Sequence, residues 1–413
     1  MRASPVQLSE RAEILDVLRG FALIGVLLDN VIAFSGWGFQ TQPFRESLPT
    51  WPADGILGLI ELTFIHGKFY SIFSILFGIG FSIILIRNQQ KGINPLKVFY
   101  RRLLILLLFG LAHCLLFWEG DILLLYALIG LLLPLFRKCS DRALLLWAIV
   151  FILSPLLIDA VKILMHANTG KFLEVMAGKI DAKTGLAGTG PDDWRQALYR
   201  EGSGWKDWRA WQASGIYYRY AYIIESNRIP KVLGLFLLGF WTGRKMIYSK
   251  IQEYTSLLKK LRKWGFIIGI PFSLAMSAFE IDNKQIPDLM GIADTFSYAF
   301  GVVPLALAYA AWLCLYWEKR KAQTNWRWLA PMGRMALTNY LMQTAFGILI
   351  YYRIGFGLGG DIGPVIFIPI SLGVYALQVL YSNVWFRYFN YGPLEWIWRQ
   401  LTYGKRLPFR KNG

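Results

Sequence analysis

Long apolar runs separated by short charged connections make up most of the chain. Ten of these runs are long enough, as helices, to approach or cross the roughly 30 Å hydrocarbon core of a bilayer. They cover residues 14–34, 64–86, 103–118, 122–136, 143–164, 232–247, 264–281, 291–317, 335–352 and 362–386. The pattern predicts an all-α, polytopic integral membrane helix bundle of about ten transmembrane helices. We expect a single transmembrane domain over residues 1–413.

The connections between these runs differ in charge. If the N-terminus is cytoplasmic, the inside segments are residues 87–102, 137–142, 244–263, 319–334 and 387–413. In that order they hold 5, 3, 7, 5 and 6 lysines and arginines. The short external connections, around Glu119, Lys284 and Arg353, hold two. By the positive-inside rule, this asymmetry predicts that both termini are cytoplasmic. Residues 387–413 are expected to form a cytoplasmic interfacial tail.

One connection is too polar to span the membrane. Residues 165–230 fall on the predicted outside, and long external segments are largely exempt from the charge rule. Their second half is rich in tryptophan and tyrosine, and Trp205, Trp208 and Trp211 recur on one helical face. This external aromatic-rich segment favours an interfacial helix anchored by its rings. The alternative is an external platform for a sugar or a lipid headgroup.

Composition supports the same class of protein. The chain is 55% hydrophobic and 17% charged, with a mean hydropathy of +0.40, which fits a membrane protein better than a soluble domain. The net charge of +18 follows the topology and suits contact with anionic membrane lipids, so no nucleic-acid partner is expected. Cys114, Cys139 and Cys314 show no ligand spacing, so we expect neither a disulfide nor a metal site.

Arginines gather near the predicted cytoplasmic end. Arg19 follows Asp16 by three residues, a spacing that lets the two pair on one helical face. Arg101 and Arg102 open the third predicted span. They either bind an anion at the inner mouth of the bundle or simply stop the span and contact lipid phosphate.

Acidic, amide and imidazole side chains gather in the outer half of the predicted bundle. At about 1.5 Å of rise per residue, this half contains Asp29, Asn30, His66, Glu119, Asp121 and Asp294. Ionisable residues at membrane depth commonly mark functional sites. Asp29, His66, Glu119 and Asp294 are therefore candidate substrate-binding residues.

His113 lies inside an apolar run, one residue before Cys114 and three after Gly110. A buried imidazole without a partner costs roughly 1–3 kcal/mol, so a partner or a role is expected. It is either a structural histidine bonded to a neighbour or a general base that is neutral at pH 7. We predict the second role, with Asp121 as a candidate to orient the imidazole.

Several motifs resemble one family across nearly the whole chain. They include "ILDVLRGFALIGVLLDNVIAF" (14–34), "GKFYSIFSILFGIGF" (67–81) and "YRRLLILLLFGLAHCLLFWEGDILLLYALIGLLL" (100–133). They continue with "VLGLFLLGFWTGR" (232–244), "GRMALTNYLMQT" (333–344) and "YGPLEWIWRQLTYGKRLP" (391–408). Together these motifs resemble the YeiB family of bacterial inner-membrane proteins, which implies a multi-pass protein of the bacterial plasma membrane.

A more distant resemblance implies a chemistry. "LDVLRG" followed by an outer asparagine is similar to the first span of heparan-alpha-glucosaminide N-acetyltransferases, which acylate a sugar across the membrane with cytoplasmic acyl-CoA. On that resemblance Asn30 matches their asparagine, and Arg101 and Arg102 resemble their basic cluster at the inner mouth. CoA is a polyanion, and a basic mouth that also contains Arg19 suits its phosphates. Those enzymes carry a histidine in or just after the first span, whereas no histidine precedes His66 here. Either His113 takes that role or the activity is not acyl transfer.

We therefore predict a membrane acyltransferase that moves an acyl group from acyl-CoA to an external or lipid-linked, sugar-like acceptor. His113 would be the base, Asn30 the oxyanion donor and Asp121 the orienting acid. A secondary transporter of a small solute and a non-catalytic scaffold or sensor are the alternatives. Whether the protein forms a homo-oligomer is left open.

Overall fold

The computed structural model describes residues 12–186, 198–199, 201–279, 289–320 and 327–411. Within these ranges every regular element is a helix, and one isolated bridge joins Phe389 and Arg410. The helices of the first half are α1 (Glu13–Phe34), η2 (Trp37–Phe39), α2 (Gln42–Glu46), α3 (Ala53–Phe64), α4 (Lys68–Gln90), α5 (Pro95–Leu116), α6 (Leu123–Gly130), η3 (Leu133–Phe136), α7 (Asp141–Met165) and α8 (Lys171–Thr184). Those of the second half are α10 (Trp205–Glu225), α11 (Arg228–Arg244), α12 (Thr255–Phe279), α13 (Leu289–Arg320), α14 (Leu329–Arg334), α15 (Ala336–Tyr351), α16 (Pro364–Tyr388) and α17 (Pro393–Tyr403).

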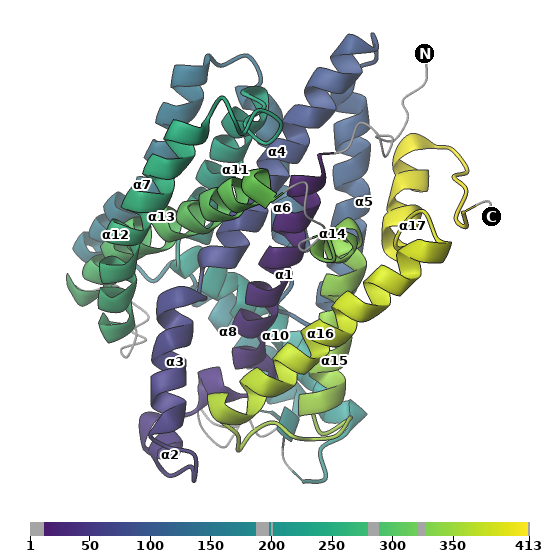
Figure 1. The fold of residues 1–413 in the computed structure, drawn as a ribbon. Coiled ribbons are helices and arrows are strands. Elements are labelled where there is room, and N and C mark those ends of the chain that lie inside the picture. Colours follow the sequence, from purple (N-terminus) through teal and green to yellow (C-terminus); the bar gives the residue numbers. More distant parts are fainter. Residues whose placement is uncertain (1–11, 187–197, 200, 280–288, 321–326, 412–413) are drawn as a thin grey trace.

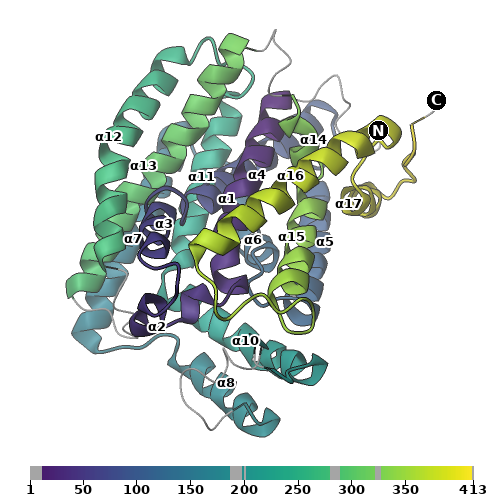
Figure 2. The ribbon, with the colours of Figure 1, turned by 60° about the horizontal axis from the view of Figure 1, so that its bottom comes forward.

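The helices form one bundle around α1 (Figure 1). Helices α7, α12 and α13 lie on one flank, α5, α15 and α16 lie on the other, and α1, α4, α6 and α11 lie between them. Helix α17 and the start of α1 lie at one end of the bundle, which we call the α17 end. Helices α8 and α10 cover the opposite end (Figure 2), the α10 end.

The structure shows six helices that are long and apolar enough to cross a membrane, judged over the described residues by length and composition. They are Glu13–Phe34, Ala53–Gln90, Pro95–Leu116, Asp141–Met165, Gly291–Arg320 and Pro364–Tyr388. The other four predicted spans fall on the short helices α6, α11 and α15, and on α12, whose first half is basic. The all-helical membrane class is thus confirmed, while the count of ten remains a prediction.

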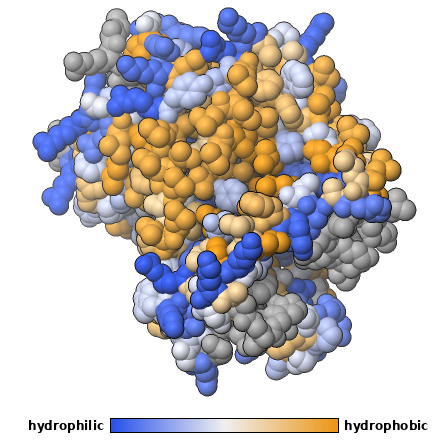
Figure 3. All heavy atoms as spheres, turned by 180° about the vertical axis from the view of Figure 1, so that it is seen from behind, coloured by the Kyte–Doolittle hydropathy of each residue, from blue (hydrophilic) through white to orange (hydrophobic). Residues whose placement is uncertain are grey.

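The surface fits a bilayer environment. Large apolar side chains are exposed along α5, α6 and α7, among them Leu104, Leu108, Leu128, Leu146 and Leu157. Figure 3 shows a broad apolar face with hydrophilic residues above and below it. Such a band would be a liability in water and is what a lipid-facing surface requires.

The predicted cytoplasmic connections meet at the α17 end. Arg244 forms an ion pair with Asp141 at 3.2 Å, which joins the segments after α11 and before α7. Arg327 approaches Glu13 at 3.8 Å, next to the start of α1. The structure therefore places these basic connections together at one end, as the positive-inside rule requires, without fixing which side of the membrane that end faces.

Glycines allow the central helices to pack backbone to backbone. A Cβ atom on Gly239 of α11 would overlap the carbonyl oxygen of Ile75 on α4, and one on Gly78 of α4 would overlap that of Phe236 on α11. On the other side of the core, a Cβ on Gly333 of α14 would overlap the carbonyl oxygen of Asp16 on α1. Small residues are the usual means of close helix contact in membranes, where no hydrophobic effect drives helices together.

We predict that Gly239→Ala loosens the contact between α4 and α11, because the new methyl group must displace the backbone at Ile75. Overpacking of this kind costs about 1–3 kcal/mol, measured as a lower thermal unfolding temperature in detergent. The matched control is Gly373→Ala on α16, where a Cβ meets no atom within 4 Å. Equal unfolding temperatures for both variants would contradict the close packing.

Candidate functional site

A cavity of about 1140 Å³ lies inside the bundle. It follows one face of α1, where Asp16, Arg19, Leu23, Val26 and Asp29 all contribute to its wall. Arg19 and Asp29 are ten residues apart, which is about 15 Å along a helix. The cavity therefore extends from the α17 end of the bundle towards the α10 end.

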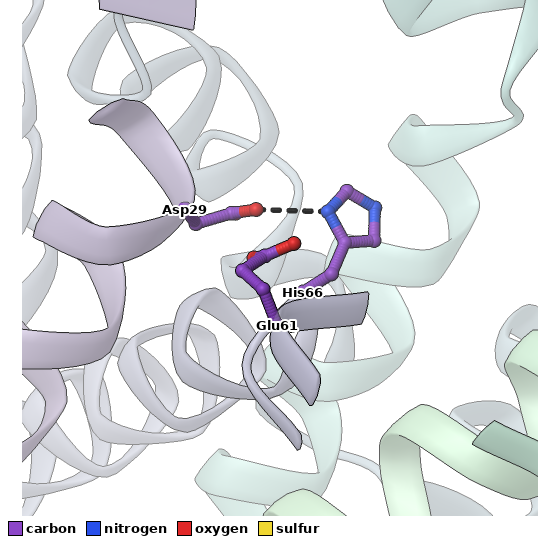
Figure 4. Close-up of side chains that lie close together, drawn as sticks. All are labelled: Asp29, Glu61 and His66. Carbon is purple, nitrogen blue, oxygen red and sulfur yellow. Dashed lines mark hydrogen bonds and ion pairs between the residues drawn. The ribbon is translucent and has the colours of Figure 1, made fainter. Parts of the chain in front are cut away.

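Asp29, Glu61 and His66 meet where the cavity approaches the α10 end (Figure 4). His66 Nδ1 lies 2.8 Å from Asp29 Oδ1, and the two side chains are 23% and 27% exposed. The Glu61 side chain points into the same space. Asp29 and His66 are thus held together by a hydrogen bond, and both side chains are still open to the cavity.

The chain reversal between α3 and α4 sets the position of His66. The backbone N–H groups of Ile65 and His66 both donate to the Glu61 carbonyl oxygen, which closes α3. Gly67 then takes a left-handed conformation with φ +78°, which glycine adopts without steric cost. The break turns the imidazole away from the helix line and towards α1.

The Asp29–His66 pair has the geometry of a base and its orienting acid. In the tautomer where His66 Nδ1–H donates to Asp29, the lone pair lies on Nε2. A carboxylate in this position fixes the tautomer and stabilises the imidazolium that forms when the ring takes up a proton. The arrangement can therefore perform general base chemistry.

The same three residues could also hold a metal ion. Their ligand atoms all lie within 4.8 Å of one another, and carboxylate with imidazole is a common donor set for divalent metals. However, the positive charges of Arg228 and Arg219 both act on Asp29. Because nearby guanidinium groups repel any cation, they disfavour a bound metal ion and an imidazolium alike.

Four arginines line the cavity at the α17 end: Arg19, Arg102, Arg334 and Arg399. Arg19 forms an ion pair with Asp16 at 2.8 Å. Arg102 stacks on the Trp398 ring at 4.0 Å, and Arg334 stacks on Phe386 at 3.9 Å. Stacking on an aromatic ring holds a guanidinium plane in place, and Arg334 also donates to the Asn390 carbonyl oxygen at 3.3 Å.

Helix α17 is fixed to the bundle beside these arginines. Glu395 is buried and accepts hydrogen bonds from the backbone N–H groups of Leu337 and Thr338, at 2.7 and 3.1 Å. It thereby caps α15, where a carboxylate is favoured by the helix dipole. Arg101 donates to the Leu401 carbonyl oxygen at 3.1 Å. Of the two predicted anion-binding arginines on α5, Arg102 lines the cavity and Arg101 contacts α17.

His113 and Asp121 pair as the sequence suggested, but away from the cavity wall. His113 Nδ1 lies 2.7 Å from Asp121 Oδ1, and Nε2 lies 2.9 Å from the Thr344 hydroxyl. Asp121 also accepts from the Leu124 N–H at 2.6 Å. Both residues are 2% exposed, and neither is among the residues that line the cavity. This geometry is what a structural link between α5, α6 and α15 requires.

The remaining predicted residues separate into two groups. Asn30 and Glu119 line the cavity with Asp29 and His66, and burial raises the pKa of Glu119. Asp294 does not line it. Its neighbour Thr295 instead donates to Asp159 at 2.7 Å.

Asp159 belongs to a buried network that sequence reasoning missed. Lys162 donates to Asp159 at 3.1 Å, to Asn227 at 2.9 Å and to the Glu225 carbonyl oxygen at 2.7 Å. The network joins α7, α13 and the turn between α10 and α11. The available signal was the three-residue spacing of an acid and a lysine within an apolar run.

Helix α10, in the aromatic-rich segment, packs two of its three tryptophans against the bundle. Trp208 and Trp211 of α10 are buried at 6% and 4% exposure, whereas Trp205 is 65% exposed. Trp211, Tyr218, Arg219 and Tyr222 line the cavity. Helix α10 therefore covers the α10 end of the cavity, and its two buried indoles do not face lipid as an interfacial anchor would.

The chain has relatives in several bacteria. A family model described as "Protein of unknown function (DUF418)" matches residues 242–405. The chain is 30% identical to "Uncharacterized protein YxaH" of Bacillus subtilis (strain 168), over 98% of both chains. It is 29% identical to "Uncharacterized protein YeiB" of Escherichia coli (strain K12), over 95% of this chain and 96% of that protein. It is 27% identical to "Uncharacterized 39.9 kDa protein in amylase 3'region" of Bacillus acidopullulyticus, over 98% and 97%.

We predict that Asp121→Ala destabilises the bundle, because His113 and the Leu124 N–H both lose a buried acceptor. Each unsatisfied group costs about 1–3 kcal/mol, detected as a lower thermal unfolding temperature in detergent. The control is Glu253→Ala, whose ion pair with Lys250 is exposed and is worth less than about 1 kcal/mol. An unchanged unfolding temperature for Asp121→Ala would remove the structural role of the pair.

Proposed function

The chain belongs to the YeiB family. We propose, from the geometry of its cavity, that it is a membrane acyltransferase that uses acyl-CoA. The donor would enter at the α17 end, and a sugar-like acceptor would meet it at the α10 end. The observation that carries this proposal is that one cavity has arginines at one end and the Asp29–His66 pair at the other. By the positive-inside prediction the α17 end is cytoplasmic, where acyl-CoA is made.

The arginines suit the donor. CoA carries a pyrophosphate and a further phosphate, and guanidinium groups bind phosphate oxygens in pairs of parallel hydrogen bonds. Arg19, Arg102, Arg334 and Arg399 surround the α17 end of the cavity. Arg102 is held in place by Trp398, whose indole N–H donates to the Arg102 carbonyl oxygen at 3.0 Å.

The length and lining of the cavity suit the rest of the donor. About 15 Å of α1 separate Arg19 from Asp29, a span that the extended pantetheine arm of CoA can bridge. The wall between the two ends is largely apolar, with Leu23, Val26, Leu76, Phe77 and Leu106 among its residues. Such a lining can hold an acyl thioester and keep water away from it.

His66 would act as the general base. Its Nε2 takes the proton from the acceptor hydroxyl or amine as that group attacks the thioester carbonyl carbon. When the carbon–sulfur bond breaks, the proton passes to the CoA thiolate, so the thiol leaves and the histidine returns to its neutral form. Asp29 holds the ring in the required tautomer throughout.

Asn30 would stabilise the charge that develops during attack. It lines the cavity one residue after Asp29, and its side-chain amide can donate to the oxyanion of the tetrahedral intermediate. A donor of this kind is typically worth about 10²–10³ in rate.

A secondary transporter is the second candidate function, and the extent of the cavity favours it. A solute site with polar groups along a path from one end of a bundle towards the other is also expected of a transporter. The two proposals differ in one respect, because only the acyltransferase releases CoA.

We predict that His66→Gln lowers the rate of CoA release from acetyl-CoA, with an amino sugar as acceptor, by roughly 10²–10⁴-fold. Glutamine keeps hydrogen bonding to Asp29 but cannot take up the proton. His113→Gln is the matched control and should keep the rate, because His113 lies outside the cavity wall. If His113→Gln lost the rate and His66→Gln kept it, His113 would be the general base, as the sequence alone suggested.

The same assay separates proton transfer from metal catalysis. We expect the rate to survive removal of divalent metals by a chelator. Loss of the rate, with recovery on adding a divalent cation, would instead assign Asp29, Glu61 and His66 to a metal site.

A further inference from the structure

Two arginines face the cavity at the α10 end, beside the Asp29–His66 pair. Arg219 lies on α10, and Arg228 is the first residue of α11. Asn227, between the two helices, adopts a left-handed conformation with φ +50°. This tight turn directs α11 back across the bundle and brings both guanidinium groups to the same wall.

Their described contacts are aromatic rings. The Arg228 guanidinium lies 5.3 Å from the Tyr222 ring centroid and 5.1 Å from that of Tyr70. Arg219 lies 5.8 Å from the same Tyr222 ring. Among the residues that the structure describes, no carboxylate forms an ion pair with either arginine, and Arg219 Nε is buried without a hydrogen-bond partner.

The nearby acids do not fill this role. Asp29 is bound to His66 at 2.8 Å. Glu119 also lines this part of the wall. Burial raises its pKa and the charge of Arg219 lowers it, but no ion pair joins Glu119 to Arg219 among the described residues. Burial and the charge of Arg228 both lower the pKa of Arg219, because two like charges lie close together in a poorly solvated place. Burial acts on Arg228 as well, but Tyr222, Tyr70 and Asp29 outweigh it and raise the pKa of Arg228. An oxyanion between the two guanidinium groups would relieve both their repulsion and their poor solvation.

We propose that Arg219 and Arg228 bind a phosphate or carboxylate group of the acceptor. This assignment rests on the proposed function, because only acyl transfer requires an acceptor. It names the substrate class as an anionic, sugar-like molecule rather than a neutral one. The guanidinium planes rest on tyrosine rings, so their N–H edges face the bound group. The anion then positions the acceptor hydroxyl or amine next to His66.

The bound group has two sources. One is a soluble sugar that carries phosphate or carboxylate, and the other is a lipid headgroup whose phosphate enters from the bilayer. The chemistry of recognition is the same, and the composition of the membrane distinguishes them.

The test is anion binding by the full chain in nanodiscs of phosphatidylcholine. Inorganic phosphate is titrated against chloride at constant ionic strength, and tryptophan fluorescence is followed, because Trp211 and Trp118 line the cavity. We expect saturable binding in the natural sequence and at least tenfold weaker binding in Arg219→Gln and Arg228→Gln. Arg353→Gln, which removes the same charge outside the cavity wall, should bind phosphate normally.

Further arginine variants show which end of the cavity holds the anion and guard against a failure to fold. Loss of binding in Arg19→Gln but not in Arg219→Gln or Arg228→Gln would place the anion at the α17 end and overturn the proposal. If the glutamine variants do not fold, Arg219→Lys and Arg228→Lys keep the charge and should still weaken binding, because the planar fork is lost.

A lipid source gives its own signature. Discs that contain phosphatidylglycerol should then raise the thermal unfolding temperature of the natural sequence but not that of the two arginine variants. If neither phosphate nor this lipid shows an effect that depends on Arg219 and Arg228, the proposal is wrong. CoA binding, measured in the same discs, tests the proposed function separately, so either proposal can fail alone.

Discussion

A charged side chain inside an apolar bundle has to be paired, hydrogen-bonded or open to a cavity, because hydrocarbon solvates none of its hydrogen-bonding groups. The structure shows all three solutions. Lys162 is surrounded by acceptors from Asp159, Asn227 and a backbone carbonyl. Glu395 is satisfied by the N-terminus of α15. The arginines at both ends and the Asp29–His66 pair line the cavity, and the proposed chemistry rests on this group.

The two ends of the cavity are covered by segments with little apolar character. At one end α17 is fixed by Glu395 and by the stacking of Arg102 on Trp398. At the other end α10 buries Trp208 and Trp211 against the bundle and contributes Arg219 to the wall. Both segments were expected to lie along the membrane surface because of their tryptophans. In α10, Trp208 and Trp211 are instead buried against the bundle, because a cavity needs walls at its ends as well as along its sides.

Sequence reasoning succeeded where one helix carries the signal. Apolar runs predict helices, basic connections predict a common end, and the three-residue spacing of Asp16 and Arg19 predicts their ion pair. It also suggested that His113 and Asp121 could pair. It could not rank His113 against His66, because periodicity does not show which face of a buried helix borders a cavity. Arg219 and Arg228 escaped notice because they stand in a polar segment, where an arginine is ordinarily solvated.

The proposed mechanism requires that one cavity link a donor at the α17 end to an acceptor at the α10 end. The direct measurement uses proteoliposomes of a single orientation, with labelled acetyl-CoA supplied only on the α17 side and an anionic amino sugar only on the other. We expect acetylated sugar on the far side, CoA released on the α17 side in equal amount, and loss of both in His66→Gln. Movement of sugar across the membrane without CoA release would contradict it.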